Sequence, residues 1–315
     1  MEKEPVMSLS SREAYKAELT ELARNDGRII CMEADLGGKN HVFQTDHPDR
    51  FFNIGIAEAA GIDMAAGLAE AGFVPFFSTF ASFAALRAAE SIKLAMGYMG
   101  KNIKIAAAYG GVSGGWFGTT HHCLEDIAVL QSFQHVRIAC PHGEEETRRV
   151  IREAAASPEP YYIRLARNDG FRSLERPTGS SAREILYQGG KREGAQLCLI
   201  SVGEQATEIC ARLAEENPDL LHAHLVYVDS PSLKRYAEEL RTLSGTFLVV
   251  EEHRGTGGTA SYLSLLLPEC RVYSHDCGEE WPVYGGTHAE VLEQLGFGLP
   301  GLRRQAAAIG GHHGI

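Results

Sequence analysis

The sequence predicts an α/β fold with two domains, each built on a mostly parallel sheet flanked by helices. Short β-rich runs alternate with amphipathic helical stretches along the chain, which favours parallel strands joined by helices. The chain has 315 residues, and at about 150 residues per domain this length suits two domains. Residues 168–186 lose the periodicity and collect Gly, Pro and Ser, as a linker does. We therefore expect a first domain over residues 1–172, a linker over 173–186 and a second domain over 187–315.

Turn and cap residues mark the elements of the first half. The Asn-Asp-Gly turn at residues 25–27 precedes the first strand, and Gly72 closes an Ala-rich helix. Pro75 suits the end or the edge of a strand. The expected strands are residues 28–32, 73–77, 103–109, 136–140 and 161–165. The expected helices are residues 55–71, 81–96 and 143–156, and a further helix is expected to begin near His121.

The second half repeats this alternation after the linker, so we expect a second α/β unit there. Its expected strands are residues 196–202, 223–228 and 246–251, and its expected helices are residues 204–215, 232–242 and 257–266.

Composition excludes several classes of protein. The net charge of −11 opposes nucleic-acid phosphates and anionic lipids, so we expect neither a nucleic-acid-binding nor a membrane-surface protein. No apolar stretch approaches the ~20 residues of a membrane span, and the polar N-terminus lacks an apolar signal segment. The seven cysteines show no CxxC spacing, which favours free thiols in a reducing compartment. We therefore expect a cytoplasmic protein.

Histidine is abundant, with 13 residues, but the sequence lacks the spacing of a known metal site. No HExxH motif occurs, and the adjacent His121 and His122 would not face each other on a helix. We expect no metal site formed by this chain alone.

A glycine-rich segment is the first candidate for chemistry. Residues 110–122, GGVSGGWFGTTHH, hold two aromatic residues and two histidines beside five glycines. They match neither a Walker A loop nor a dinucleotide-binding fingerprint. Either the segment is a long surface loop, or its backbone approaches a ligand closely, with a histidine at the start of the next helix.

Glu58 and a group of phenylalanines are the other candidates. Glu58 lies among small residues in GIAEAAG, either on the solvent-facing stripe of a helix or buried. A buried carboxyl group is more easily protonated near neutral pH, which suits proton transfer. A hydrophobic core explains the phenylalanines as well as a ring-stacking platform does. They are Phe76, Phe77, Phe80 and Phe83.

Together these features resemble the transketolase family. Residues 51–83 and 110–130 resemble its pyrimidine-binding domain, and VVEEH at 249–253, followed by GTGG, resembles its C-terminal domain. EADL at 33–36 and YYIRLAR at 161–167 resemble flanking segments of the family. The resemblance extends from about residue 8 to residue 297.

The resemblance implies thiamine diphosphate as the cofactor and assigns residues to it. Glu58 matches the glutamate that hydrogen-bonds a ring nitrogen of the aminopyrimidine and so promotes loss of the thiazolium proton. Phe80 matches the aromatic residue that packs on the aminopyrimidine, and Phe83 is expected to line the same pocket. Asp35, in the EADL segment, is expected to contact the cofactor as well.

The resemblance also implies a substrate site. His121 matches a histidine that hydrogen-bonds a terminal hydroxyl of the donor or the developing oxyanion. Arg12 and Arg167 match arginines that bind the sugar phosphate, and a guanidinium fork suits that anion. Lys39 lies where the family often has a small polar residue beside the substrate.

Trp116 and Phe117 depart from the family, because they replace its acidic pair. An aromatic ring cannot accept the hydrogen bond of a sugar hydroxyl, so the usual aldose phosphate acceptor is not expected. Thr119 replaces the family's proline in the same loop.

The diphosphate-binding domain of the family is missing. In transketolases it holds the diphosphate through a metal ion with a GDG motif and a later asparagine, and this chain has no GDG. A separate N-terminal subunit is therefore expected to supply Mg²⁺ or Ca²⁺ binding. Two copies of each chain, with self-association and active sites at the interfaces, are expected.

The expected function is transfer of a two-carbon ketol unit from a ketose, expected to be phosphorylated, to an acceptor. Within the same cofactor class, the beta subunit of a 2-oxo acid dehydrogenase and a 1-deoxyxylulose-5-phosphate synthase-like enzyme stay open as alternatives. A non-catalytic scaffold or regulatory homologue is the alternative from another class.

Overall fold

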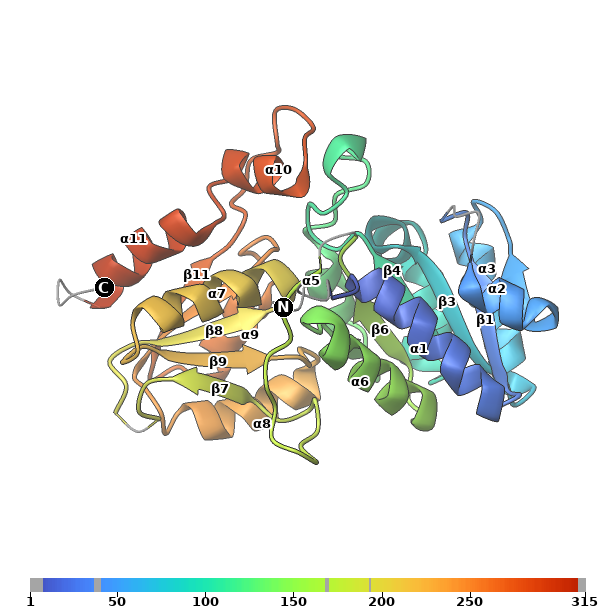
Figure 1. Ribbon diagram of the computed structural model, residues 1–315, viewed down its shortest axis with the longest axis horizontal. Coiled ribbons are helices and arrows are strands. Elements are labelled where there is room, and N and C mark those ends of the chain that lie inside the picture. The colour runs from blue at the N-terminus through green and yellow to red at the C-terminus, as the bar shows by residue number, and fades with distance from the viewer. Residues whose placement is uncertain (1–7, 37–40, 168–169, 193, 311–315) are drawn as a thin grey trace, which may run out of the picture.

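The computed structural model describes residues 8–36, 41–167, 170–192 and 194–310, and it contains two β-sheets, each covered by helices on both faces. Figure 1 shows the two sheets side by side, the first formed by the N-terminal half of the chain and the second by the C-terminal half. The predicted fold class, two α/β units with mostly parallel strands, is confirmed.

The first sheet has six parallel strands in the order β2-β1-β3-β4-β6-β5. β3 and β4 are central and fully buried over most of their length, so their carboxyl ends lie in the middle of one sheet edge. The strands are β1 (Ile29–Glu33), β2 (Phe51–Asn53), β3 (Val74–Phe80), β4 (Lys104–Ala108), β5 (Arg137–Ala139) and β6 (Tyr161–Arg164).

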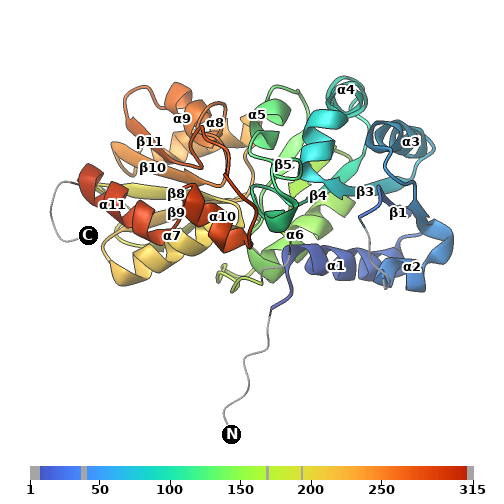
Figure 2. The ribbon, with the colours of Figure 1, turned by 90° about the horizontal axis from the view of Figure 1, so that it is seen from above.

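Helices cover both faces of this sheet, as Figure 2 shows. On one face lie α1 (Ser11–Asn25), α2 (Val42–Asp46) and α6 (Gly143–Ala156). On the other lie α3 (Glu58–Glu70), α4 (Ala89–Ile92) and α5 (Asp126–Gln131), with two π-helical segments, η2 (Phe83–Arg87) and η3 (Lys93–Tyr98). Short 3₁₀ turns, η1 (Pro48–Arg50) and η4 (Gly115–Phe117), complete this half.

The second sheet has the order β11-β10-β8-β9-β7, and its edge strand β7 is antiparallel to β9. Its strands are β7 (Leu186–Gly189), β8 (Cys198–Val202), β9 (Leu221–Leu225), β10 (Thr246–Glu251) and β11 (Arg271–His275). Its helices are α7 (Glu204–Glu216), α8 (Ser230–Leu240), α9 (Thr259–Leu266), α10 (His288–Gln294) and α11 (Leu299–Gly310).

Two expected helices differ from the structure. The helix expected from His121 begins at Asp126, because Gly115 and Gly118 adopt positive φ angles and keep the preceding chain in turns. The helix expected over residues 81–96 is broken into η2, α4 and η3. The expected domain limits stay a prediction, and the first sheet ends at Arg164 while the second begins at Leu186.

Within the described part of the chain, no helix is long and apolar enough to cross a membrane. All seven cysteines carry free thiols, and six of them are buried.

Candidate active site

Glu58 is the first residue of α3, and its side chain is only 2% exposed. A carboxylate at a helix N-terminus interacts favourably with the helix dipole. α3 packs tightly against β3 at Gly61, where an added Cβ would lie 2.5 Å from Ile54 Cδ1 and 2.7 Å from Phe77 Cζ. The solvent-facing interpretation of Glu58 is therefore wrong, and the small residues around it explain its burial.

Arg87 is the ion-pair partner of Glu58. Its Nη1 lies 2.9 Å from Oε2 and 3.1 Å from Oε1 of the glutamate. The guanidinium also lies over the Phe83 ring, with Cζ 4.1 Å from the ring centroid. The Arg87 side chain is 48% exposed, so an accessible cation neutralises a buried carboxylate.

Aromatic rings line the carboxyl ends of β3 and β4. Phe80 ends β3 and stacks on Tyr109, which follows β4, with centroids 4.5 Å apart. Phe83 meets Phe80 edge to face at 5.6 Å. Of the predicted phenylalanines, these two form the platform, while Phe76 and Phe77 are fully buried in the core.

His121 lies within this group of rings. Phe80 and Phe83 meet its ring edge to face at 5.3 and 5.2 Å, and Phe117 stacks on it at 4.8 Å. Burial, and then the charge of Arg87, lower the pKa of His121, so the neutral imidazole predominates at pH 7. A neutral imidazole both donates and accepts a hydrogen bond. His122 instead is buried and reaches the Gly115 carbonyl with Nε2 at 3.3 Å.

Arg12 and Arg167 converge on Tyr109 from distant parts of the chain. Arg167 Cζ is 4.9 Å from the ring centroids of both Tyr109 and Phe117. Arg12, in the first turn of α1, has its Cζ 5.9 Å from the Tyr109 centroid, and its Nη2 donates to the Leu36 carbonyl at 3.1 Å. Two predicted anion-binding residues therefore lie beside the predicted aromatic platform.

Asp35 follows β1 in a left-handed conformation with φ of 47°, and its side chain is exposed. Its position past the carboxyl end of β1 puts it at the same sheet edge as Phe80. Lys39 lies outside the described residues.

The glycine-rich segment is held in place by the second half of the chain. Glu252 Oε1 accepts hydrogen bonds from the Val112 backbone at 2.6 Å and from His288 Nε2 at 2.9 Å. At Gly111, with φ of 67°, a Cβ would lie 2.2 Å from that same Oε1. The glycine is needed for this close contact between the two halves.

The tip of the segment carries Trp116 and Phe117 on η4, beside the loop before α10, as Figure 1 shows. An added Cβ at Gly115 would lie 2.7 Å from the Gly286 carbonyl oxygen, so the two loops touch. Phe117 turns toward His121, whereas Trp116 is 71% exposed.

Sequence reasoning missed Arg87 and Tyr109. Arg87 reaches Glu58 from a π-helical segment, whose altered periodicity the sequence pattern does not reveal. Tyr109 adopts a φ of 64°, which is uncommon for a bulky residue and often marks a functional site. An aromatic residue directly before GG at the end of a buried strand is the signal that could have found it.

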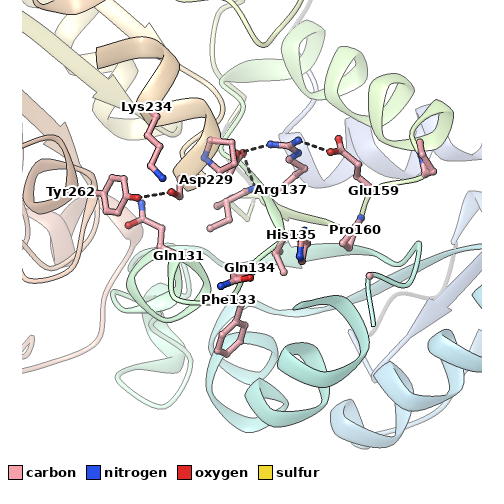
Figure 3. A pocket seen from close by; sticks show the side chains of 16 residues that line it. Gln131, Phe133, Gln134, His135, Arg137, Glu159, Pro160, Asp229, Lys234 and Tyr262 are labelled. Carbon is pink, nitrogen blue, oxygen red and sulfur yellow. Dashed lines mark hydrogen bonds and ion pairs between the residues drawn. The ribbon is translucent and has the colours of Figure 1, made fainter. Parts of the chain in front are cut away.

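A pocket of about 580 Å³ lies elsewhere, at the junction of the two halves. Figure 3 shows Arg137 of the first half between Glu159 of the same half and Asp229 of the second half, with Lys234 and Tyr262 also lining the pocket. Arg137 already pairs with Asp229 and Glu159. The pocket adjoins the starts of β5 and β6, whereas the candidate site adjoins the ends of β3 and β4. None of the predicted site residues that the structure describes lines the pocket.

Among the described residues, no group of three or more His, Cys, Asp or Glu side chains is arranged to hold a metal ion. The site therefore combines a buried carboxylate, an aromatic platform, a neutral histidine and three arginines, one of which, Arg87, pairs with the carboxylate. This set suits a planar heteroaromatic ring that shares a proton with the carboxylate, together with an anionic substrate.

Comparisons with known proteins agree with this chemistry. The family model described as "Transketolase, pyrimidine binding domain" matches residues 7–171. A putative transketolase C-terminal section from Methanocaldococcus jannaschii is 33% identical over 256 residues, 78% of each chain. One subunit of an apulose-4-phosphate transketolase from Phocaeicola vulgatus is 30% identical over 316 residues, 95% of this chain and 96% of that one.

A solved structure described as a split gene transketolase, inactive beta4 tetramer, has a similar fold. It superposes with a TM-score of 0.79 at 28% identity, over 96% of this chain and 97% of that chain.

Proposed function

Because this chain belongs to the transketolase family, we propose that it is the C-terminal subunit of a split, thiamine-diphosphate-dependent transketolase-like enzyme. The enzyme transfers a two-carbon ketol unit from a phosphorylated ketose to an acceptor and is active only with an N-terminal partner subunit. The observation that carries this proposal is Glu58, buried at the start of α3 beside an aromatic platform and His121.

The residues present fit the aminopyrimidine of thiamine diphosphate. Glu58 supplies a carboxyl group in a dry position, and Phe80 and Phe83 supply ring faces. Thr79 Oγ1 and Ser82 Oγ, on either side of Phe80, are buried without a hydrogen-bond partner among the described residues, so polar groups remain for a ligand. The bound cofactor supplies a carbon nucleophile that this chain lacks.

Each protein residue has a role in this proposal. Glu58 shares a proton with a ring nitrogen of the cofactor, and Phe80 and Phe83 orient the ring, with Asp35 at the same sheet edge. His121, neutral at pH 7, donates a hydrogen bond to the substrate oxygen on which charge develops.

The arginines indicate the substrate class. Arg12 and Arg167 flank Tyr109, and guanidinium groups suit a phosphate. Phe117 covers His121 and Arg167 with an apolar face, and Trp116 stands at the outer end of the same turn. We propose that Phe117 and Trp116 select an acceptor that lacks the hydroxyl group to which the family's acidic pair hydrogen-bonds. Lys39 is proposed to lie near the substrate on resemblance alone.

Exposed apolar side chains support a partner contact beside Glu58. Ile56 is 71% exposed, Met64 on α3 is 51% exposed, and Leu86 on η2 is 50% exposed. The same helical layer carries Tyr98 and Met99, which are also exposed. Soluble monomers rarely gather apolar groups in this way, whereas interfaces do.

We propose that this face binds the N-terminal subunit, which holds Mg²⁺ or Ca²⁺ and the diphosphate, in an assembly with two copies of each chain. The similar split gene transketolase is described as inactive as a beta4 tetramer, which supports self-association without activity for chains of this kind. The free thiols suit a cytoplasmic location, which is part of the proposal.

Glu58→Gln and Glu58→Ala test the proposal in the reconstituted complex. Both remove the proton-sharing carboxylate, so ketol transfer should fall by at least about 100-fold. Glu70→Gln is the matched control, since Glu70 ends the same helix and is exposed. Glu58 variants that stay within a few-fold of wild type would remove it from this role. Pyruvate in place of the ketose tests the two alternatives of the same cofactor class.

A further inference from the structure

Arg87 occupies the centre of the candidate site. Its guanidinium lies between the buried carboxylate of Glu58, at 2.9 and 3.1 Å, and the face of Phe83, at 4.1 Å. These are two of the groups to which the proposed function assigns the cofactor's aminopyrimidine. An arginine and a cofactor cannot use one carboxylate and one ring face at the same time.

The two groups have similar chemistry. A guanidinium is planar and delocalised, directs N–H donors at a carboxylate, and stacks on aromatic rings. An aminopyrimidine is also planar, with nitrogen atoms at its edge and a π face. We propose, on the basis of the proposed function, that Arg87 is a placeholder that holds Glu58 in the free subunit and is displaced when the cofactor binds.

In the free subunit the buried carboxylate of Glu58 needs a partner. Glu58 is 2% exposed, and a buried carboxylate without a partner is strongly destabilising. Arg87 supplies that partner while the cofactor and the N-terminal subunit are absent.

The Arg87 side chain can also move away from Glu58. Arg87 is the last residue of η2, and its side chain is 48% exposed. Its guanidinium can therefore turn into solvent without repacking the core. Because Glu58 is buried and Arg87 is half exposed, the carboxylate stays in place and the guanidinium moves when the cofactor replaces it.

The pair has an energetic consequence for assembly. A ligand that competes with an internal group binds with an apparent affinity reduced by the fraction of molecules in which its site is open. Arg87 therefore weakens cofactor binding, and its removal should strengthen it.

Binding of thiamine diphosphate, with Mg²⁺ present, tests this inference in the complex with the N-terminal subunit. Arg87→Met keeps the length of the side chain and removes the charge, so the dissociation constant should fall about tenfold and association should be faster. Arg87→Lys, which loses the planar fork, should lie between Arg87→Met and wild type. Lys93→Met is the control, because Lys93 is an exposed cation of the neighbouring η3.

A second measurement uses the isolated full chain and needs no cofactor. Arg87 acts with burial to lower the pKa of His121, so an NMR titration should show a higher pKa of His121 in Arg87→Met and no change in Lys93→Met. This reports that Arg87 stands at the site in solution.

The outcomes separate the two proposals. If wild type binds thiamine diphosphate and Arg87→Met binds it equally or more weakly, the placeholder is wrong and the proposed function stands. An unchanged pKa of His121 in Arg87→Met also contradicts the placeholder. If no variant of the complex, wild type included, binds the cofactor, the proposed function fails and the placeholder fails with it.

Discussion

The Phe117 ring joins two parts of the candidate site. It stacks on His121 at 4.8 Å and lies 4.9 Å from Arg167 Cζ, so one side chain orients both the proposed hydrogen-bond donor and the proposed phosphate ligand. Stacking and cation–π contacts are worth about 1 kcal/mol each. The Phe117 side chain therefore contributes to the geometry of the site through its ring contacts.

Phe117→Ala should lower kcat/KM of the reconstituted enzyme by about tenfold, mainly through a higher KM, because Arg167 loses its ring support. Steady-state kinetics with a phosphorylated donor measure this. Trp281→Ala is the control, since Trp281 is an exposed aromatic residue of the neighbouring loop. Equal effects of both variants would show that Phe117 acts only by covering surface.

Individual residues show what the sequence can predict about the site. The resemblance to the transketolase family predicts Glu58, Phe80 and His121 as site residues. In the structure Phe80 contacts His121, and Arg87 pairs with Glu58. Arg87 and Tyr109 escape prediction, since a π-helical segment and a positive φ are set by packing around them. A family resemblance thus predicts residues of a site, while tertiary contacts decide which further side chains reach it.

The helices and strands likewise divide into those that the sequence predicts and those that it misses. Strands with a clear apolar run are predicted to within a few residues, and α6 is predicted at its observed limits. These strands are β1, β3, β4, β5, β6, β8, β9 and β10. The edge strands β2, β7 and β11 are missed, because short and partly exposed strands lack a continuous apolar run. The expected linker is not a free tether, because Arg176 within it is buried against Glu146.

Glu146 connects three elements. It projects from α6, its Oε2 is 2.7 Å from His224 Nε2 on β9, and its Oε1 is 2.8 Å from Arg176 Nε in the expected linker. Burial alone would raise the pKa of Glu146, but His224 and Arg176 together lower it to about 2. The carboxylate is thus ionised and holds the two halves of the chain to each other.

Glu146→Gln should lower the free energy of unfolding by about 3–5 kcal/mol, because it leaves the buried guanidinium of Arg176 without its charged partner. Urea unfolding at pH 7 measures this loss. Glu144→Gln on the same helix removes a partly exposed pair with Arg148 and should cost no more than about 1 kcal/mol. Similar losses in the two variants would contradict a special role for Glu146.

Across the whole molecule, the two halves form one unit around the candidate site. Val112 and Leu124, at the two ends of the glycine-rich loop, are packed into a core with Leu199 and Val250 of the second sheet. The second half therefore supports, at both ends, the loop that carries His121 and Phe117.

Glu204 gives this junction a measurable dependence on pH. It begins α7 in the second half and accepts hydrogen bonds from Ser11 Oγ at 3.0 Å and the Ala166 backbone at 3.1 Å in the first half. Burial raises the pKa of Glu204 to about 7 from an ordinary value of 4.5, so the folded protein binds this proton more strongly than the unfolded chain. Its contribution to stability is thus fully present below pH 4.5 and is lost as the pH rises through about 7.

Glu204→Gln keeps an acceptor and removes the charge, so its stability relative to wild type should increase between pH 5 and pH 8, by up to about 3 kcal/mol. His142 and His222 change the stability with pH in the opposite direction to Glu204. Comparing each variant with wild type at the same pH cancels their contribution. Burial lowers their pKa values to about 4 and about 3, so they favour the folded state above pH 6.5 and lose that contribution in acid. Glu208→Gln, on the same helix and partly exposed, should follow wild type at both pH values. Parallel curves for Glu204→Gln and wild type would show that Glu204 stays ionised in the folded protein.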